Sequence, residues 1–385
     1  MHISLTRRDR SSRSLPSSLP PQAAAATQTS SRSRIATIVV AVAGLAAGVL
    51  PGTASAAVRP LANACDVTVV PIGQGGVPGT LEAAAGDTVQ LTANSVCEPV
   101  IGPVFNPRTG TTEPGLVSGD GIAIEAPGVK LDLNGFGMRS SRDIAAEAAA
   151  QGADVENAGV IVGAQNVTVT NSSTTAASKV VNFTANFDFG KGGDFSTLRG
   201  AKLADGSYNL VGGDAHGGGV LAIDRTQRIT LDTVALVDLA AEPPAAAAAA
   251  GDNGIDWKRC TGPTGTITNS MVVGPLTGLR MRGCTSGGFS ATGTTFQSPA
   301  TLQSPGGPGI EFTRDVKGAS LTGNTISGNA ADGVSVRTAN ENISITNNTI
   351  QNNGGCGILK AATAKNITTL PNAFLNNAGG DVCTK

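Results

Sequence analysis

The stretch that decides the fold is residues 309–380, which read GIEFTRDVKGASLTGNTISGNAAD (309–332), GVSVRTANENISITNNTIQNNGGC (333–356) and GILKAATAKNITTLPNAFLNNAGG (357–380). Each segment starts with glycine and an apolar residue, and similar residues then recur at the same places. The recurring residues include two asparagines and one large apolar residue per segment: Asn324, Asn348 and Asn372; Asn329, Asn353 and Asn377; Ile326, Ile350 and Phe374. A period of about 24 residues that holds at so many places predicts a repeat architecture.

Each segment contains three short stretches in which inward apolar and outward polar residues alternate, which is typical of strands. A strand this short cannot bury its apolar side alone, so we expect successive segments to stack and form three parallel sheets. The stacked asparagines are expected to hydrogen-bond to one another at bends, where asparagine also tolerates the left-handed backbone conformation. The pattern therefore predicts an all-β fold, a single-stranded parallel β-helix with three sheets. A leucine-rich repeat, the main competitor, needs a leucine framework that these segments lack.

Similar coils begin further upstream, so the solenoid extends beyond the regular segments. Their first glycines are Gly254 and Gly278, with weaker copies at Gly121, Gly159 and Gly219. In the coil from Gly254, the places of the recurring asparagine and apolar residue fall on Asn269 and Met271.

Two coils carry extra residues, at about 243–252 and 296–308, directly before the first strand of the next coil. Insertions on one side of a solenoid often mark its binding face, so we expect these two to rise beside the first sheet. Residues 180–218 are either another irregular coil or a long loop.

Two phrases near the start of the repeat region carry a resemblance to a known family. They are TLEAAAGDTV (80–89) and VKLDLNG (129–135). Together with the repeat, they resemble the right-handed parallel β-helix superfamily that includes the pectate-lyase-like proteins. The resemblance covers about residues 80–380 and implies a right-handed solenoid. It implies no single activity, because the superfamily hosts lyases, hydrolases, epimerases and non-catalytic adhesins.

The N-terminal segment has the order of an export signal. Six arginines precede an apolar run at 35–50, which ends in the small-residue site Ala54-Ser55-Ala56. The run is too short to span a bilayer, so we expect cleavage before Ala57 and a secreted, extracellular protein without a transmembrane segment, with association with the cell surface as a further option. The expected organisation is a signal peptide (1–56), an N-terminal cap with the first coil (57–120) and the β-helix (121–385). The remaining net charge of about −6 argues against nucleic acid as a partner.

All six cysteines follow the export signal, and an even number outside the cytosol suggests disulfides. Cys260 and Cys284 occupy the same place in successive coils, where stacking brings their Cα atoms within the separation that a disulfide needs. A Cys356–Cys383 pair would fasten the last coil, and Cys65–Cys97 would close the N-terminal cap.

The outward positions of the first strand hold the candidate site. One outward column reads Leu221, Asp256, Arg280, Glu311 and Ser335; the next reads Ile223, Lys258, Arg282, Thr313 and Arg337. The first alternates in sign, as a purely structural set of ion pairs would. The second places like charges on adjacent coils, which is unfavourable; Asp256 and Glu311 relieve part of this cost, and a basic surplus remains. A solvated charged face without a ligand is the structural alternative. Clustered arginines suit a carboxylated polysaccharide, which they grip in bidentate fashion.

These residues lead to two hypotheses of function. The first is a lyase-like enzyme acting on an acidic, uronate-containing polysaccharide, with Lys258 as base and Arg282 and Arg337 on the substrate carboxylates. In it Asp256, Arg280 and Glu311 help to bind and orient the substrate, and calcium is a further candidate as cofactor. The second is a non-catalytic extracellular or cell-surface solenoid that binds a glycan. Polygalacturonase-like hydrolysis is disfavoured, because Arg280 and Arg282 stand where that family has paired aspartates. Neither the oligomeric state nor the polysaccharide follows from the sequence.

Overall fold

The computed structural model describes residues 56–106, 110–142, 144, 157–190, 192–213, 215, 219–238, 253–300 and 306–385. The expected export signal lies outside these residues except for Ala56, and so does the insertion at 243–252. The described residues form strands, turns and bends but no helix, and none of them could cross a membrane as a helical span. The all-β prediction is therefore confirmed.

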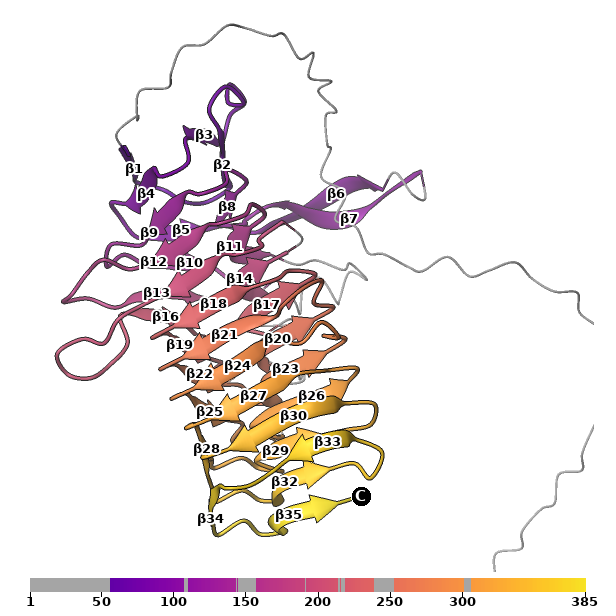
Figure 1. Ribbon diagram of the computed structural model, residues 1–385. Coiled ribbons are helices and arrows are strands. Elements are labelled where there is room, and N and C mark those ends of the chain that lie inside the picture. The colour runs from indigo at the N-terminus through magenta and orange to yellow at the C-terminus, as the bar shows by residue number, and fades with distance from the viewer. Residues whose placement is uncertain are drawn as a thin grey trace, which may run out of the picture. The chain divides into compact units, whose positions relative to one another are not determined.

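Three parallel sheets run side by side along the solenoid, and from residue 122 to residue 375 each coil contributes one strand to each sheet (Figure 1). We call them sheet 1, sheet 2 and sheet 3 in the order in which a coil enters them.

Sheet 1 has twelve strands in the order β3 (Thr80–Ala83), β2 (Val67–Pro71), β8 (Ile122–Ile124), β11 (Ala158–Val162), β14 (Ala185–Phe189), β17 (Leu221–Asp224), β20 (Asn253–Lys258), β23 (Thr277–Arg282), β26 (Ile310–Arg314), β29 (Val334–Val336), β32 (Cys356–Lys360) and β35 (Gly380–Thr384).

Sheet 2 has eleven: β1 (Val58–Leu61), β4 (Thr88–Leu91), β9 (Lys130–Asp132), β12 (Thr168–Thr170), β15 (Thr197–Arg199), β18 (Ile229–Asp232), β21 (Gly265–Thr268), β24 (Phe289–Thr292), β27 (Ala319–Thr322), β30 (Glu341–Thr346) and β33 (Lys365–Thr368).

Sheet 3 has ten: β34 (Ala373–Leu375), β31 (Thr349–Gln351), β28 (Thr325–Ser327), β25 (Thr295–Gln297), β22 (Met271–Val273), β19 (Ala235–Val237), β16 (Leu210–Gly212), β13 (Ser178–Val181), β10 (Met138–Ser140) and β5 (Ser95–Cys97).

The core is a set of apolar columns, because inward residues of successive coils pair in register. On sheet 1 one such column is fully buried: Ile122, Val160, Phe187, Leu221, Ile255, Leu279, Ile310, Val334 and Ile358. The 180–218 segment is a coil, since its strands β14, β15 and β16 enter the three sheets in turn. Stacking apolar columns is the main source of stability in such a solenoid.

The predicted asparagine ladders are present, and they stack side chain on side chain. The Nδ2 atoms of Asn324 and Asn348 each donate to the next Oδ1 at 3.0 Å, and those of Asn329 and Asn353 do so at 2.7 Å. The left-handed conformation belongs to the residue just before the ladder, such as Asn347 at φ 58° and Asn352 at φ 55°. Two successive residues thus divide the tasks of turning the backbone and bonding the coils together.

Further upstream the ladder is displaced by one residue from its expected place. Asn269 is exposed, and the next residue, Ser270, holds the ladder position: its backbone N–H points at Thr294 Oγ1. Val272, rather than Met271, is fully buried and pairs with Phe296. The turn after β20 is one residue longer than in the regular coils, which shifts everything behind it.

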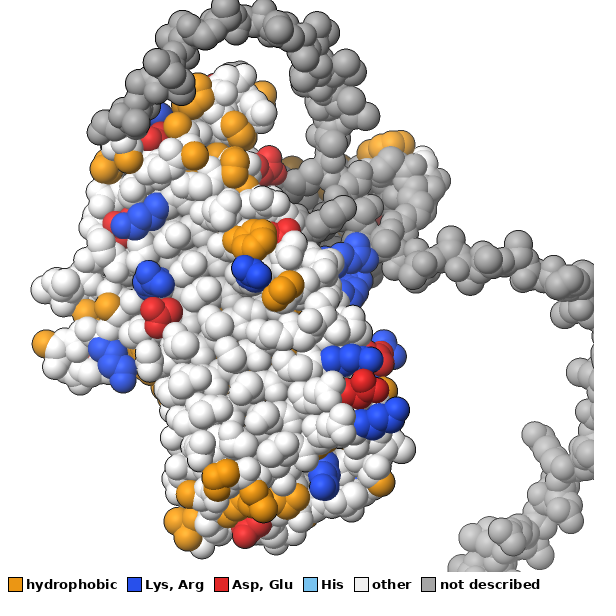
Figure 2. All heavy atoms as spheres, in the orientation of Figure 1, with side chains coloured by type: hydrophobic (Ala, Val, Ile, Leu, Met, Phe, Trp, Pro, Cys, Tyr) orange, Lys and Arg blue, Asp and Glu red, His pale blue; other side chains and the backbone are white. Residues whose placement is uncertain are grey.

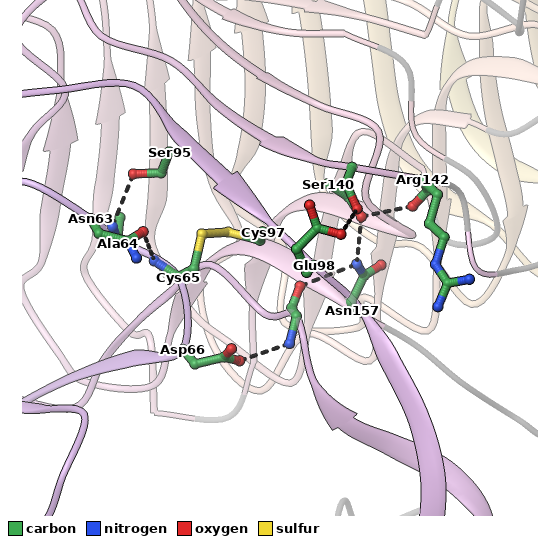
Figure 3. The surroundings of a disulfide bond; sticks show 12 residues. Asn63, Ala64, Cys65, Asp66, Ser95, Cys97, Glu98, Ser140, Arg142 and Asn157 are labelled. Carbon is green, nitrogen blue, oxygen red and sulfur yellow. Dashed lines mark hydrogen bonds between the residues drawn. A yellow bond between two sulfur atoms is a disulfide. The ribbon is translucent and has the colours of Figure 1, made fainter.

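The structure contains the three disulfides predicted from the sequence, of which Cys260–Cys284 followed from the register. Cys65–Cys97, Cys260–Cys284 and Cys356–Cys383 have Cα separations of 5.2, 4.6 and 6.1 Å. Figure 3 shows the first of them linking the segment after β1 to the end of β5. Beside it, Ala64 N–H donates to Ser95 Oγ at 2.9 Å, which ties the same two segments a second time.

One antiparallel hairpin departs from the solenoid. It consists of β6 (Val100–Asn106) and β7 (Thr111–Ser118), and Figure 1 shows it projecting from the first coils. Its base packs Ile101 and Leu116 against Ile144, while Phe105 is exposed.

Candidate functional site

The candidate site lies on the outer face of sheet 1, where β20 places Asp256 between two inward residues. Ile255 and Trp257 point into the core, so the side chain between them points out. Asp256 is nevertheless only 3% exposed, because longer side chains from its own strand and the next coil cover it. A buried carboxylate needs partners of opposite charge.

Three cations supply those partners. Arg280 grips Asp256 with both arms, Nε to Oδ1 at 3.2 Å and Nη2 to Oδ2 at 3.1 Å. The same Oδ2 accepts from Arg282 Nη2 at 3.3 Å and lies 3.8 Å from Lys258 Nζ. The structure thus brings four of the six predicted site residues together, with Lys258, Arg280 and Arg282 around one oxygen of Asp256. We call these four residues the Asp256 cluster.

The Asp256 cluster has more positive than negative charge, and its cations remain accessible. Arg280, Arg282 and Lys258 have side-chain exposures of 25, 38 and 29%. A guanidinium has five N–H donors, of which Asp256 occupies two on Arg280 and one on Arg282. Free donors on a half-exposed, positively charged face can bind an anion from solution.

The other two predicted residues form a separate pair. Glu311 accepts a hydrogen bond from Arg337 Nε, and Thr313 Oγ1 lies 3.4 Å from the other Glu311 oxygen. Glu311 is nearly buried, whereas more than half of the Arg337 side chain is exposed. Glu311 also stands opposite Arg280 in the strand register, so this pair continues the charged face towards the C-terminal coils.

The structure corrects the upstream end of both outward columns. Leu221 and Ile223, expected to face outward, point into the core, and Asp224 stands opposite Lys258. The shift arises because β17 enters the sheet one residue later after Gly219 than β20 does after Gly254. Alignment on the buried apolar pair of each strand, rather than on its glycine, would have found Asp224.

Two further arginines belong to this face and were missed by the sequence analysis. Arg259 grips Asp224 with Nε at 2.7 Å and with Nη2, and this hydrogen bonding raises the pKa of the guanidinium. A register shift after Met281 places Arg314, instead of the expected Thr313, opposite Arg282. Charged side chains therefore extend over four successive strands of sheet 1, from β17 to β26, and continue with Arg337 directly after β29.

The donor set of this face does not fit a calcium ion. The carboxylates of Asp256 and Glu311 are already bound by arginine or lysine, and calcium requires several free oxygen ligands. Across the described ranges, no group of three or more His, Cys, Asp or Glu side chains converges.

Two other features of the molecule give little information on the candidate site. A cavity of about 220 Å³ lies on sheet 3 among β5, β10 and β13, away from the Asp256 cluster. Of the two insertions expected beside sheet 1, the one at 243–252 lies outside the described residues, as do residues 301–305 of the one at 296–308.

Comparison with known proteins bears on the fold. Residues 252–384 match the family model described as "Right handed beta helix region". The search among curated proteins finds no match.

Solved structures of similar architecture share little sequence with this chain. The A-module of mannuronan C-5 epimerase AlgE4 from Azotobacter vinelandii has a TM-score of 0.45 and 11% identity, over 78% of this chain and 80% of that one. The surface adhesin PfbA of Streptococcus pneumoniae has a TM-score of 0.38 and 11% identity, over 78% and 81%. Likenesses at this level give no information on activity. The three sheets and the family match together make this chain a right-handed parallel β-helix.

Proposed function

We propose that this protein is an extracellular β-helix that binds an acidic, uronate-containing polysaccharide on the charged face of sheet 1. The observation that carries the proposal is the Asp256 cluster, in which one buried carboxylate holds three partly exposed cations in fixed positions. The three disulfides agree with an oxidising location outside the cytosol.

Preorganisation is what makes the Asp256 cluster suited to binding. A free arginine loses side-chain entropy when it grips a ligand, but Arg280 and Arg282 are already held by Asp256. Their remaining N–H donors match the two oxygens of a carboxylate. Lys258 adds a third positive charge on the same side of the strand pair.

A polymer can engage more than one point of this face. Arg337 lies two coils beyond Arg282, at a distance of roughly 10 Å along the stack. A polysaccharide running along the solenoid axis would place successive carboxylates on the Asp256 cluster and on Arg337. Such two-point binding strengthens affinity without any new type of contact.

The proposal is tested by measuring binding of pectate, alginate, hyaluronan, chondroitin sulfate and neutral dextran. We expect an acidic polymer to bind, dextran to fail, and salt to weaken the binding. The double variant Arg282→Ala/Arg337→Ala should bind about tenfold more weakly. Arg139→Ala removes an exposed arginine from β10 of sheet 3; it is the matched control and should leave affinity unchanged. Equal binding of dextran, or an unaffected double variant, would refute the proposal.

A second candidate function is β-elimination, favoured by Lys258 and Arg282 sharing one carboxylate oxygen. Arg282 would hold the uronate carboxylate and stabilise charge that develops on it, while Lys258, in its neutral form, would take the proton from C5. The electron pair then forms the C4=C5 double bond, and the C4–O bond breaks with its electrons leaving on oxygen.

Ultraviolet absorbance of unsaturated uronates separates the two candidates. Elimination predicts a rise in absorbance that Lys258→Met abolishes and that added chelator leaves unchanged. If the same polymers bind but no absorbance appears, the elimination candidate is excluded and the non-catalytic binding function stands.

A further inference from the structure

Sheet 2 carries a regular array of hydroxyl groups on its outer face. One outward column has a hydroxyl on eight successive strands: Thr168, Thr197, Thr230, Thr266, Ser290, Ser320, Ser344 and Thr368. A second column, two residues further along each strand, has threonine on four: Thr268, Thr292, Thr322 and Thr346. We call these the hydroxyl columns.

The hydroxyl columns are free of charge and available to solvent. None of their residues is buried. In the part of the chain that the structure describes, only Thr268 among them bonds through its hydroxyl to the protein, donating to Asp232 Oδ1 at 2.9 Å. Figure 2 shows the same feature as a broad white area over the middle strands of sheet 2, with charged side chains at its margins.

Threonine is common on exposed strands because of its β-propensity, so composition alone would not make a site. The unusual feature is the segregation of charge within one set of coils. Strands β20, β23 and β26 carry the charged face of sheet 1, whereas the hydroxyl columns of the following strands β21, β24 and β27 carry neither charge nor aromatic ring.

The spacing of the columns is fixed by the scaffold. Neighbouring coils place equivalent residues about 4.8 Å apart, and two residues along a strand span about 6.6 Å. The ladder of Asn324, Asn348 and Asn372 follows directly after sheet 2 and clamps successive coils together. The hydroxyls therefore form a rigid two-dimensional lattice rather than a set of independent side chains.

We propose that the hydroxyl columns bind the surface of ice. A rigid lattice favours a solid that is itself periodic in two directions, because binding then costs little ordering of either partner. The repeat between neighbouring coils is close to the shorter oxygen repeat on a prism face of hexagonal ice. Each hydroxyl can donate to and accept from lattice water, and each threonine methyl excludes mobile water between the columns.

The chemistry of the face favours ice over crystalline polysaccharide. A flat sugar surface is normally recognised by aromatic rings stacked on its apolar faces, and the hydroxyl columns contain none. Nor do they contain the cations that an acidic polymer requires. This inference concerns a different face and a different ligand from the proposed function, so either can fail without the other.

The test compares two threonines of one coil that differ in the face they occupy. Thr322 in β27 belongs to the hydroxyl columns, and Thr325 in β28 points outward from sheet 3. Thermal hysteresis and inhibition of ice recrystallisation are measured for the full protein, for Thr322→Lys and for Thr325→Lys. We expect activity in the parent and in Thr325→Lys. Thr322→Lys should need an about tenfold higher concentration to stop recrystallisation, because one charged side chain spoils the fit of its neighbours.

Circular dichroism and the midpoint of unfolding are measured for both variants as the control, and we expect both to fold equally well. Absence of any effect of the parent protein on ice growth would overturn the proposal, as would equal losses in the two variants. Sedimentation with crystalline cellulose or chitin provides the competing outcome: binding there that Thr322→Lys abolishes would assign the face to polysaccharide instead.

Discussion

Sheets 1 and 2 share the same coils and the same core, yet their outer surfaces are opposites. Sheet 1 groups its charged side chains around Asp224, Asp256 and Glu311, whereas sheet 2 presents hydroxyls on eight strands. The inward residues of both sheets are equally apolar and equally buried. The comparison teaches that a solenoid separates its tasks by face: inward columns determine the fold, and outward columns are free to differ.

The largest loss of stability is expected from substitution of the side chain that packs sheet 1 against sheet 2. Trp257 of sheet 1 is fully buried and packs edge-to-face on Phe289 of sheet 2, with ring centroids 5.6 Å apart. Trp257→Ala should lower the free energy of unfolding by about 3–5 kcal/mol, because it leaves a cavity that the surrounding coils cannot fill. Chemical denaturation measures the loss.

Trp257→Phe is the matched control. It keeps most of the buried volume and removes an indole N–H that has no hydrogen-bond partner among the described residues. Its cost should therefore be well below that of Trp257→Ala. If both variants lost the same stability, the indole would contribute something other than packing, and the two faces would not share a common support.

The inward residues are also what could be predicted from the sequence. From 309 to 380 the period is strict, and the predicted partners Ile326–Ile350 and Ile350–Phe374 pair as expected. One additional turn residue after β20 was enough to misplace Asn269 and Met271, because counting from a glycine carries any turn insertion into every later position. The prediction that a stretch is apolar and buried survives such a shift, but the prediction of which residue faces outward does not.

The next effect is confined to sheet 1. Asp256→Asn keeps the shape of the side chain but leaves Lys258, Arg280 and Arg282 facing one another without a carboxylate. We expect a loss of roughly 2–3 kcal/mol, because removing one member of a buried charge group leaves the others uncompensated. Added salt should restore part of it by screening the repulsion.

Asp224→Asn provides the comparison for Asp256→Asn. The Asp224 side chain is about a quarter exposed and, among the described residues, forms its ion pair with Arg259, so its loss should cost under about 1 kcal/mol. Equal costs for the two variants would show that burial of the Asp256 cluster contributes nothing, and would remove the argument for its preorganisation.

The candidate site was only partly visible in the sequence. The outward positions of Asp256, Arg280 and Glu311 followed from the alternation of the strand. Their convergence did not, because the alternation says which side a residue faces and nothing about where a long arginine side chain ends. Arg282 and Lys258 belong to the second column by sequence, yet both reach sideways to a carboxylate in the first. Arg314 was hidden by a register shift that no sequence pattern announces.

A third prediction concerns what holds the hydroxyl columns in register. Asn348 is buried, accepts from Asn324, and donates to Asn372 Oδ1 and to the carbonyl oxygens of Leu321 and Thr346. Asn348→Ala should cost about 2 kcal/mol, because buried partners on three coils lose their bonds. Asn347→Gly is the control. Asn347 is exposed and has φ 58°, a conformation that glycine adopts without strain, so this substitution should change the free energy of unfolding little. Similar losses in both would mean that the ladder is not what couples the coils.

The smallest expected effect is a pH dependence at the N-terminal edge of sheet 2. There β1 is fastened to β4 by the carboxylate of Asp87, which accepts from Ala57 N–H at 2.9 Å, from Ala84 N–H at 3.0 Å and from Arg59 Nε at 2.7 Å. The backbone donors, first of all Ala57, and the guanidinium lower the pKa of Asp87 from 3.8 to about 2. In a chain cleaved before Ala57 the first donor is an α-ammonium group, which binds the same carboxylate more strongly.

A carboxyl group whose pKa is lower in the folded state stabilises the protein above its unfolded pKa. For Asp87 this stabilisation is complete near neutral pH and is lost as pH falls from about 5 through 2. The unfolding midpoint of the parent protein should fall over that range by more than that of Asp87→Asn, which starts lower and changes less. Asp205, whose pKa is lowered mainly by hydrogen bonds from the adjacent Ser207 in an exposed turn, provides the control, because Asp205→Asn releases no strand from the stack. A parent protein and an Asp87→Asn variant with parallel pH profiles would show that β1 is held by its strand pairing with β4 alone.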